Sequence, residues 1–238
     1  MLQTKKIEYR DGDTILEGYC AFDNRTSGKK PAVLVAHDWS GRNDFACQKA
    51  EKLAEMGYVG FALDMYGQGK TGKTTEEKKA LMQPLISDRA ALRKRVLAAF
   101  ETVDKLEFVN NAKIGAIGFC FGGLCALDLA RSGAEVKGVA SFHGLLFAPE
   151  NLPDKSIRAK ILALHGHDDP MVPPDQVAAF QKEMTTASVD WQIHIYGNTK
   201  HAFSNPMAND QELGLIYNKL AEKRSWIAMT SFFAEIFG

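Results

Sequence analysis

The fold of this chain is decided by the stretch Gly118-Phe119-Cys120-Phe121-Gly122-Gly123. It follows an apolar run at residues 113–117 and precedes an apolar segment with helical periodicity at residues 124–130. This order predicts a strand, a sharp turn and a helix, with glycines where the two backbones come too close for a Cβ atom. Cys120 occupies the serine position of a G-x-S-x-G pattern. Its thiol is therefore either a nucleophile, activated by the positive end of the following helix, or a buried structural cysteine.

Strands and helices alternate on both sides of this turn. Apolar or alternating runs predict further strands at residues 31–36, 58–63, 136–142, 159–164 and 191–196. Residues 3–10 and 14–22, joined by Asp11-Gly12-Asp13, predict an antiparallel hairpin. No linker or repeat interrupts the alternation. The sequence therefore predicts one α/β domain over residues 1–238, built on a doubly wound, mostly parallel sheet with helices on both faces.

Four other segments show helical periodicity, at residues 45–56, 75–106, 176–185 and 213–237. Pro84 is expected to kink or divide the second of these, and Ser87-Asp88 is placed to cap its second half. Asp175 is expected to cap the third. The fourth is predicted to be a long amphipathic helix that closes the fold.

The composition excludes several classes of function. Lys and Arg together number 29 and Asp and Glu together number 29, so no basic excess indicates a nucleic-acid partner. No apolar run reaches the roughly 18 residues of a membrane span, and the first ten residues lack the apolar region of a signal peptide. We therefore expect a cytoplasmic protein without a membrane partner. Cys20, Cys47, Cys120 and Cys125 lack metal-binding spacing, so we expect reduced thiols, no metal and no organic cofactor.

Residues 67–74, GQGKTGKT, fit the phosphate-binding pattern G-x-x-x-x-G-K-[ST] between a strand and a helical segment. The alternative is a flexible, solvated loop at a strand end. A nucleotide hydrolase of this type also needs a downstream strand that ends in a metal-holding aspartate, and no apolar strand here offers one. Asp64 precedes the loop and cannot take that role. The sequence favours the loop.

Three loops that follow predicted strands carry reactive side chains: Cys120, Asp169 and His201. Loops beyond the carboxyl ends of parallel strands gather along one edge of the sheet, so these side chains can converge. The order nucleophile, acid, histidine is that of α/β hydrolases. His201 would take the Cys120 proton or hold it as an ion pair, and Asp169 would orient the imidazole. Asp168 is the rival acid, but the spacing from Gly166 and the following Pro170 favour Asp169.

Over essentially the whole chain the sequence resembles the dienelactone hydrolase family. The resemblance rests on the stretch around Cys120, on His165-Gly166 through Asp169-Pro170 to Val172-Pro173, and on His201-Ala202-Phe203. It implies an α/β-hydrolase fold and hydrolysis of small esters or lactones through an acyl-enzyme. The turn His37-Asp38-Trp39-Ser40-Gly41 matches the oxyanion loop of the family.

The resemblance also assigns roles to four further residues. It implies that the backbone N–H groups of Trp39 and Phe121 bind the oxyanion. Asp38 stands where the family has a glutamate that pairs with the resting thiol and releases it when substrate arrives. Asn205 stands where the family has an arginine that binds the substrate carboxylate.

The remaining polar residues receive structural interpretations. His143 and His165 end strands and are expected to be satisfied groups near the surface. Arg89 is either in reach of the cleft or on a solvated helix face, with the solvated face favoured. Three functions stay open: a thiol hydrolase of small esters or lactones, which is favoured, a noncatalytic binding module of hydrolase fold, and a nucleotide-binding protein. We expect a monomer or a small homo-oligomer.

Overall fold

The computed structural model describes residues 1–25, 27–150 and 156–238. Its strands are β1 Leu2–Asp11, β2 Thr14–Asp23, β3 Lys30–Ala36, β4 Val59–Ala62, β5 Val109–Phe119, β6 Gly138–Phe142, β7 Lys160–Gly166, β8 Trp191–Tyr196, β9 Asn209–Asp210 and β10 Leu215–Ile216. Its helices are α1 Asp44–Glu55, α2 Thr75–Ser87, α3 Arg89–Asp104, α4 Phe121–Arg131, α5 Pro174–Thr186 and α6 Lys219–Phe237.

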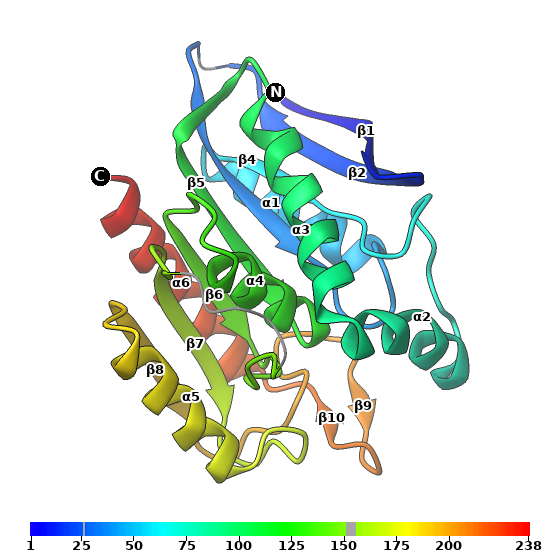
Figure 1. Cartoon of the computed structure of the whole chain (residues 1–238), viewed down its shortest axis with the longest axis vertical. Coiled ribbons are helices and arrows are strands. Elements are labelled where there is room, and N and C mark those ends of the chain that lie inside the picture. The colour runs from blue at the N-terminus through cyan, green and yellow to red at the C-terminus, as the bar shows by residue number, and fades with distance from the viewer. Residues whose placement is uncertain (26, 151–155) are drawn as a thin grey trace.

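Eight of these strands form one sheet in the order β1-β2-β4-β3-β5-β6-β7-β8 (Figure 1). The first pairings, β1 with β2 and β2 with β4, are antiparallel, and the strands from β4 through β8 pair in parallel. The predicted α/β-hydrolase architecture, with its antiparallel N-terminal hairpin, is confirmed. The single domain over residues 1–238 stays a prediction.

Helices cover both faces of the sheet, and strand alternation decides what each face buries. On β3, Ala32, Leu34 and Ala36 pack into one core with residues of α3, α4 and α5. Val33 and Val35 point the other way, into a second core with α1 and α6. Figure 1 shows the same arrangement, with α3, α4 and α5 in front of the sheet and α1 and α6 behind it. Both faces of the central strands are therefore dry, which explains their nearly continuous apolar sequences.

Glycines let the chain turn sharply between β5 and α4. A Cβ on Gly118 would lie 1.9 Å from the carbonyl oxygen of Gly122, and a Cβ on Gly122 would lie 2.1 Å from the carbonyl oxygen of Ala36. Cys120 between them has φ 56° and ψ −117°, a backbone conformation that residues other than glycine rarely adopt. The turn thus has the strained geometry that holds a side chain out beyond the sheet edge.

The predicted division of the segment 75–106 is confirmed, whereas the predicted cap of α5 needs correction. The segment divides into α2 and α3 at Asp88, four residues after Pro84, and the Asp88 side chain caps α3 by accepting a hydrogen bond from the N–H of Ala91. α5 begins at Pro174 with Pro173 as its N-cap, so Asp175 lies in the first turn and is not the cap. Proline is well suited to the first helical position because an N–H there would have no acceptor within the helix, so its absence costs no hydrogen bond.

The predicted closing helix over residues 213–237 is also wrong at its start. α6 begins only at Lys219, after the cap Asn218, and the preceding residues form the small hairpin β9–β10. Asp210 accepts a hydrogen bond from the N–H of Leu213, and Gly214 has φ 68°. Local turn bonds and a left-handed glycine stop a helix from extending into this segment. In the described part of the chain, no helix is long and apolar enough to cross a membrane.

Candidate active site

Cys120 stands at the turn between β5 and α4, where it is half-buried and lines a cleft. Its backbone N–H donates to the carbonyl oxygen of Phe142 at 3.0 Å, which ties the turn to the end of β6. No acidic residue occupies the first turn of α4 and no side chain caps it. The positive end of this helix is therefore available to negative charge on Cys120 or on a group bound to it.

His201 and Asp169 meet beside Cys120. The ring nitrogen Nδ1 of His201 lies 2.7 Å from Oδ2 of Asp169, and both side chains are buried. The other oxygen of Asp169, Oδ1, accepts a hydrogen bond from the N–H of Met171 at 2.8 Å. Asp168 is exposed, whereas Asp169 is buried and faces His201. The loops after β7 and β8 thus bring Asp169, not Asp168, to His201.

The charge of His201 depends on its neighbours. Burial on its own lowers the pKa of the imidazole, but the charge of Cys120 and the hydrogen bond with Asp169 raise that pKa to about 10. A histidine with such a pKa carries a positive charge at neutral pH and attracts negative charge on a neighbouring group. Among the described residues, Nε2 of His201 has no hydrogen-bond partner. This nitrogen is free to exchange a proton with a reacting group.

The turn after β3 presents the Trp39 N–H. His37 is fully buried; the N–H of Met65 donates to its Nε2 at 3.2 Å, so its Nδ1 donates to the carbonyl oxygen of Asp38 at 2.6 Å. The N–H and C=O of a trans peptide point in opposite directions. The Trp39 N–H is therefore turned away from the His37 ring, and the hydroxyl of Tyr66 holds the Trp39 carbonyl at 3.0 Å.

Gly122 brings this turn and the helix α4 together. A Cβ at Gly122 would lie 2.1 Å from the Ala36 carbonyl oxygen and 2.5 Å from that of His37. The N–H of Phe121, the first residue of α4, has no partner within its own helix. Such close backbones are what a pair of N–H donors needs to reach one oxygen atom.

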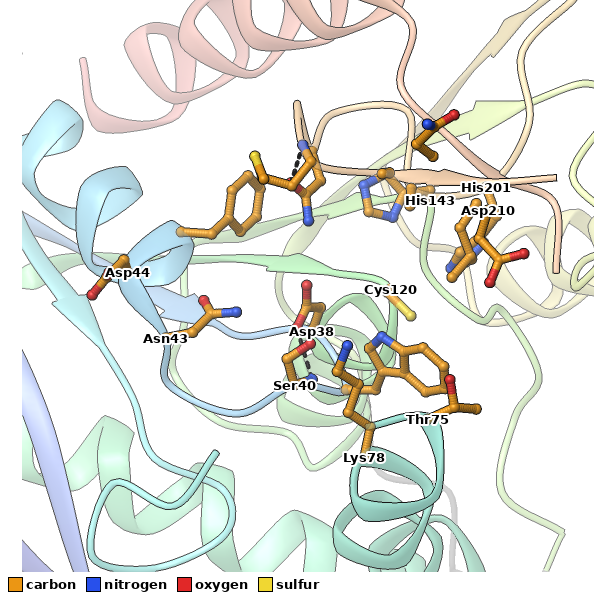
Figure 2. Close-up of a pocket in the computed structure, with 18 residues that line it drawn as sticks. Asp38, Ser40, Asn43, Asp44, Thr75, Lys78, Cys120, His143, His201 and Asp210 are labelled. Atoms are coloured by element: carbon orange, nitrogen blue, oxygen red, sulfur yellow. Dashed lines mark hydrogen bonds between the residues drawn. The ribbon is translucent and has the colours of Figure 1, made fainter. Parts of the chain in front are cut away.

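Trp39, Cys120 and His201 line one cleft of about 560 Å³. Figure 2 shows Cys120 and His201 beside each other in its wall, with Asp38 and Ser40 opposite. Helices α1 and α2 contribute Asp44 and Lys78, and the hairpin β9–β10 contributes Asp210 and Leu215. The cleft is large enough for a small organic substrate.

Asp38 and Asn205 both line the cleft, and each already has a backbone partner. Oδ1 of Asp38 accepts a hydrogen bond from the N–H of Ser40 at 2.8 Å. Oδ1 of Asn205 accepts one from the N–H of Met207 at 2.9 Å. Within the described residues, no hydrogen bond joins Asp38 to Cys120. Asn205 retains its amide N–H groups for other contacts.

Most side chains of the loop at residues 67–74 are exposed, as the solvated-loop interpretation predicts, but the protein itself occupies several of its backbone N–H groups. The carboxylate of Asp64 accepts hydrogen bonds from the backbone N–H groups of Tyr66 and Gly67 on one oxygen and from that of Gly69 on the other. A phosphate-binding loop needs such N–H groups for its ligand. Here the protein's own carboxylate occupies them. Thr74 is the N-cap of α2, where it forms a capping box with Glu77.

Arg89 takes neither of its predicted positions. It is buried and lies away from the cleft, where Nε and Nη2 each donate to the Asp128 carboxylate at 2.7 Å. Arg131 donates to the same carboxylate at 3.3 Å and to the carbonyl oxygen of Leu146 at 2.9 Å. Asp128 lies on α4, so this buried network anchors the helix that follows Cys120 to the chain after β6.

Two histidines predicted near the surface are buried. His165 is 4% exposed and His143 is 2% exposed. His143 also lines the cleft, and its ring centroid lies 5.2 Å from that of His201. The sequence placed both residues at strand ends correctly. It could not show that the last loop folds back over them.

Several residues in the cleft had no signal in the sequence. Lys78, with Nζ 5.4 Å from the centre of the Trp39 ring, comes from a helix face that reads as solvated. Asp210 comes from a hairpin where a helix was predicted. Over residues 1–25, 27–150 and 156–238, no group of three or more His, Cys, Asp or Glu side chains could hold a metal ion.

The sequence and the fold of this chain are similar to those of known proteins. A model of the dienelactone hydrolase family matches residues 16–237. A solved structure, the dienelactone hydrolase-like promiscuous phosphotriesterase P91 from metagenomic libraries, is 36% identical with a TM-score of 0.92, over 100% of this chain and 99% of that one. A putative carboxymethylenebutenolidase of Aquifex aeolicus is 27% identical over 95% of this chain and 96% of its own length. A probable 2-oxo-3-(5-oxofuran-2-ylidene)propanoate lactonase of Bradyrhizobium is 27% identical over 84% of this chain and 82% of its own.

Proposed function

The chain belongs to the dienelactone hydrolase family, whose hydrolases act on lactone or ester bonds. From this premise we propose that it hydrolyses small esters or lactones through Cys120, Asp169 and His201. The observation that carries the proposal is the placement of His201. Its Nδ1 is bonded to Asp169, and its ring lies beside Cys120 in one cleft. Nucleophile, base and orienting acid need this relation.

The proposed reaction begins with attack of the Cys120 thiolate on the carbonyl carbon of the substrate. The carbonyl oxygen becomes an oxyanion, which the N–H groups of Trp39 and Phe121 stabilise. Each such donor contributes about 3 kcal/mol to the transition state. When the intermediate collapses, the ester C–O bond breaks and the leaving alkoxide takes a proton from His201. A thioester on Cys120 and a neutral imidazole remain.

Water completes the proposed cycle. Neutral His201 removes a proton from the water as it attacks the thioester carbon, and a second tetrahedral oxyanion forms. Its collapse breaks the C–S bond, releases the carboxylic acid and regenerates the thiolate–imidazolium pair. Asp169 holds the imidazole in one orientation through both halves and stabilises its positive charge. For a lactone, alcohol and acid are the two ends of one product.

A slow aryl ester tests this proposal. We expect mass spectrometry of the stopped reaction to find one acyl group on the peptide that contains Cys120. Cys120→Ala should lose both the adduct and the turnover. Cys47→Ala is the matched control, because that thiol is also half-buried but does not line the cleft. Full turnover in Cys120→Ala would refute the proposal, whereas a wild type without any turnover or adduct would favour the noncatalytic binding module.

The nucleotide alternative has a separate test. Because Asp64 occupies the N–H groups of Tyr66, Gly67 and Gly69, we expect millimolar ATP with magnesium to leave the melting temperature unchanged. A clear increase, abolished by Lys73→Ala, would favour nucleotide binding.

A further inference from the structure

We propose that His143 is a positioning residue that sets the place of His201 relative to Cys120. The inference rests on the proposed function of those two residues. His143 directly follows β6, the strand next to β5 in the sheet. It therefore lies between the turn that carries Cys120 and the loop that carries His201: its two neighbours in sequence contact the turn, and its ring contacts the loop.

On the side of Cys120, contact is through the backbone. The Cys120 N–H donates to the carbonyl oxygen of Phe142, the residue before His143, at 3.0 Å. A Cβ on Gly123 would lie 2.6 Å from the Cα of Gly144, the residue after His143. Both neighbours of His143 thus touch the sharp turn directly. A shift of the chain here would move the nucleophile.

On the side of His201, contact is through the imidazole. The ring of His143 lies edge-on to the His201 ring, with centroids 5.2 Å apart, and edge-on to the Phe203 ring, with centroids 5.0 Å apart. Its Nε2 forms a hydrogen bond of 2.8 Å with Oγ of Ser204. One side chain therefore contacts three of the four consecutive residues 201–204.

The backbone of His143 is held in an unfavourable conformation. Its φ is +39°, in the left-handed region that favours glycine, and its N–H donates to the carbonyl oxygen of Leu164 on β7 at 2.8 Å. Such a conformation persists only where surrounding contacts require it, and it is frequent at active sites. Here the contacts that require it are those to β7 and to the His201 loop, together with the packing of Gly144 against Gly123.

The charge of the ring suits this role. Burial, and then the charge of His201, hold the pKa of His143 well below its ordinary value, so the ring stays neutral. A neutral ring can lie against an imidazolium without repelling it. The bond to Ser204 then fixes the rotation of the ring that faces His201.

The experiment compares His143→Phe with Ser204→Ala. His143→Phe keeps an aromatic ring against His201 but loses the bond to Ser204, and Ser204→Ala removes the same bond from the other side. Because small displacements of a catalytic base are costly, we expect each variant to lower kcat about tenfold while KM changes less than about twofold. The double variant should lose no more than the worse single variant, since both remove one interaction.

The matched control is Val139→Ala, a buried residue on the same strand β6 that does not line the cleft. It reports what a loss of packing on this strand does to activity. A second readout is the pH dependence of Cys120 alkylation by iodoacetamide, which follows the thiolate–imidazolium pair. We expect this profile to move in His143→Phe and Ser204→Ala and to stay in place in Val139→Ala.

Two results would overturn the inference: a kcat in both variants within the range of Val139→Ala, or a loss confined to KM. If His143→Phe fails to fold, Ser204→Ala carries the test alone. A normal kcat in the His143 and Ser204 variants beside an inactive Cys120→Ala would refute the role of His143 and leave the proposed function standing. An active Cys120→Ala would instead refute the function itself.

Discussion

The turn at residues 118–123 and the segment at residues 202–218 lie at the same edge of the sheet, but different forces determine their structures. The turn is determined by steric exclusion, because only glycine fits at Gly118 and Gly122. The segment is determined by local turn bonds and by docking: the N–H of Ile216 donates to the His201 carbonyl oxygen at 2.9 Å, and that of Tyr217 donates to Ala208 at 3.0 Å. The first region holds the candidate nucleophile rigidly. The second forms a wall of the cleft, and apart from Ser204 its side chains can differ without moving the nucleophile.

The largest effect is expected where the two regions meet, at His201. Asp169→Asn keeps the size of the side chain but removes the negative charge that accepts the Nδ1 proton at 2.7 Å. The imidazole then favours the wrong tautomer, so we expect kcat to fall about 10³- to 10⁴-fold with little change in the melting temperature. Steady-state kinetics with an aryl ester measure the loss.

Asp168→Asn is the matched control for this prediction. It makes the same change one residue earlier, at an exposed carboxylate that does not face His201. We expect its kcat to stay within twofold of the wild type. If Asp168→Asn proves to be the damaging change, the acid in the proposed mechanism is wrong.

The next effect tests steric exclusion in the turn. Gly122→Ala adds a Cβ that would lie 2.1 Å from the Ala36 carbonyl oxygen, so the turn and the strand β3 must separate. We expect a loss of about 100-fold in kcat, because the N–H groups of Trp39 and Phe121 no longer reach one oxygen atom. The melting temperature should also fall.

Gly197→Ala is the control for added bulk, since a Cβ at Gly197 would meet no atom within 4 Å. It should match the wild type in both activity and melting temperature. Equal behaviour of the two alanine variants would mean that the close backbone approach at Gly122 does not determine the geometry of the cleft.

How well the sequence predicted each region follows from the range of the forces involved. The turn needs only glycines beside an apolar strand, a pattern that is local and visible in residues 113–123. The order of Cys120, Asp169 and His201 was visible for a related reason, because parallel strands always gather their carboxyl ends. The hairpin β9–β10 was missed, because the amphipathic pattern of α6 continued upstream while Asp210 and Gly214 stopped the helix.

Contacts between distant segments were beyond sequence reasoning. Nothing in the sequence pairs Arg89 with Asp128, 39 residues apart, or brings His143 against Ser204, 61 residues apart. Such pairs form because burial leaves a charged or polar group without water and selects whichever partner the fold supplies. The identity of that partner depends on the packed structure.

A smaller effect concerns pH and again involves both regions. His201 has a folded pKa of about 10, above the value of about 6.5 in an unfolded chain. Its contribution to stability is therefore fully present below about pH 6.5 and is lost as the pH rises through about 10. Melting temperatures measured from pH 8.5 to pH 10.5 should fall more steeply in the wild type than in Cys120→Ala, where the thiolate that raises this pKa is missing. Below the ordinary thiol pKa of about 8.5, a proton moved from Cys120 to His201 leaves the number of bound protons unchanged, so no difference in slope is expected there. If the melting temperatures of the two proteins change with pH in parallel, the charge of Cys120 does not raise the pKa of His201.

The smallest effect should come from the wall at residues 202–218. Asn205 offers amide N–H groups where an arginine would bind a carboxylate, and Asp38, Asp44 and Asp210 line the cleft with Lys78 as a cation among them. Carboxylates outnumber cations around the cleft, so a substrate that carries a free carboxylate meets repulsion. We expect the wild type to hydrolyse a lactone methyl ester with a kcat/KM about tenfold above that of the matching lactone acid.

Asn205→Arg should narrow this preference by about tenfold, because a guanidinium offers two charge-assisted hydrogen bonds to a carboxylate. The control is Asn110→Arg. Asn110 also accepts a bond from the N–H two residues ahead, that of Ala112, at 3.1 Å, but it lies near the start of β5, far along the strand from Cys120. It should leave the preference unchanged. A tenfold wild-type preference for the free acid would contradict the reading of this wall and point to Lys78, whose replacement by Met should then abolish the preference. That result would leave the position of Cys120 in the turn unaffected and would change only the explanation of substrate preference.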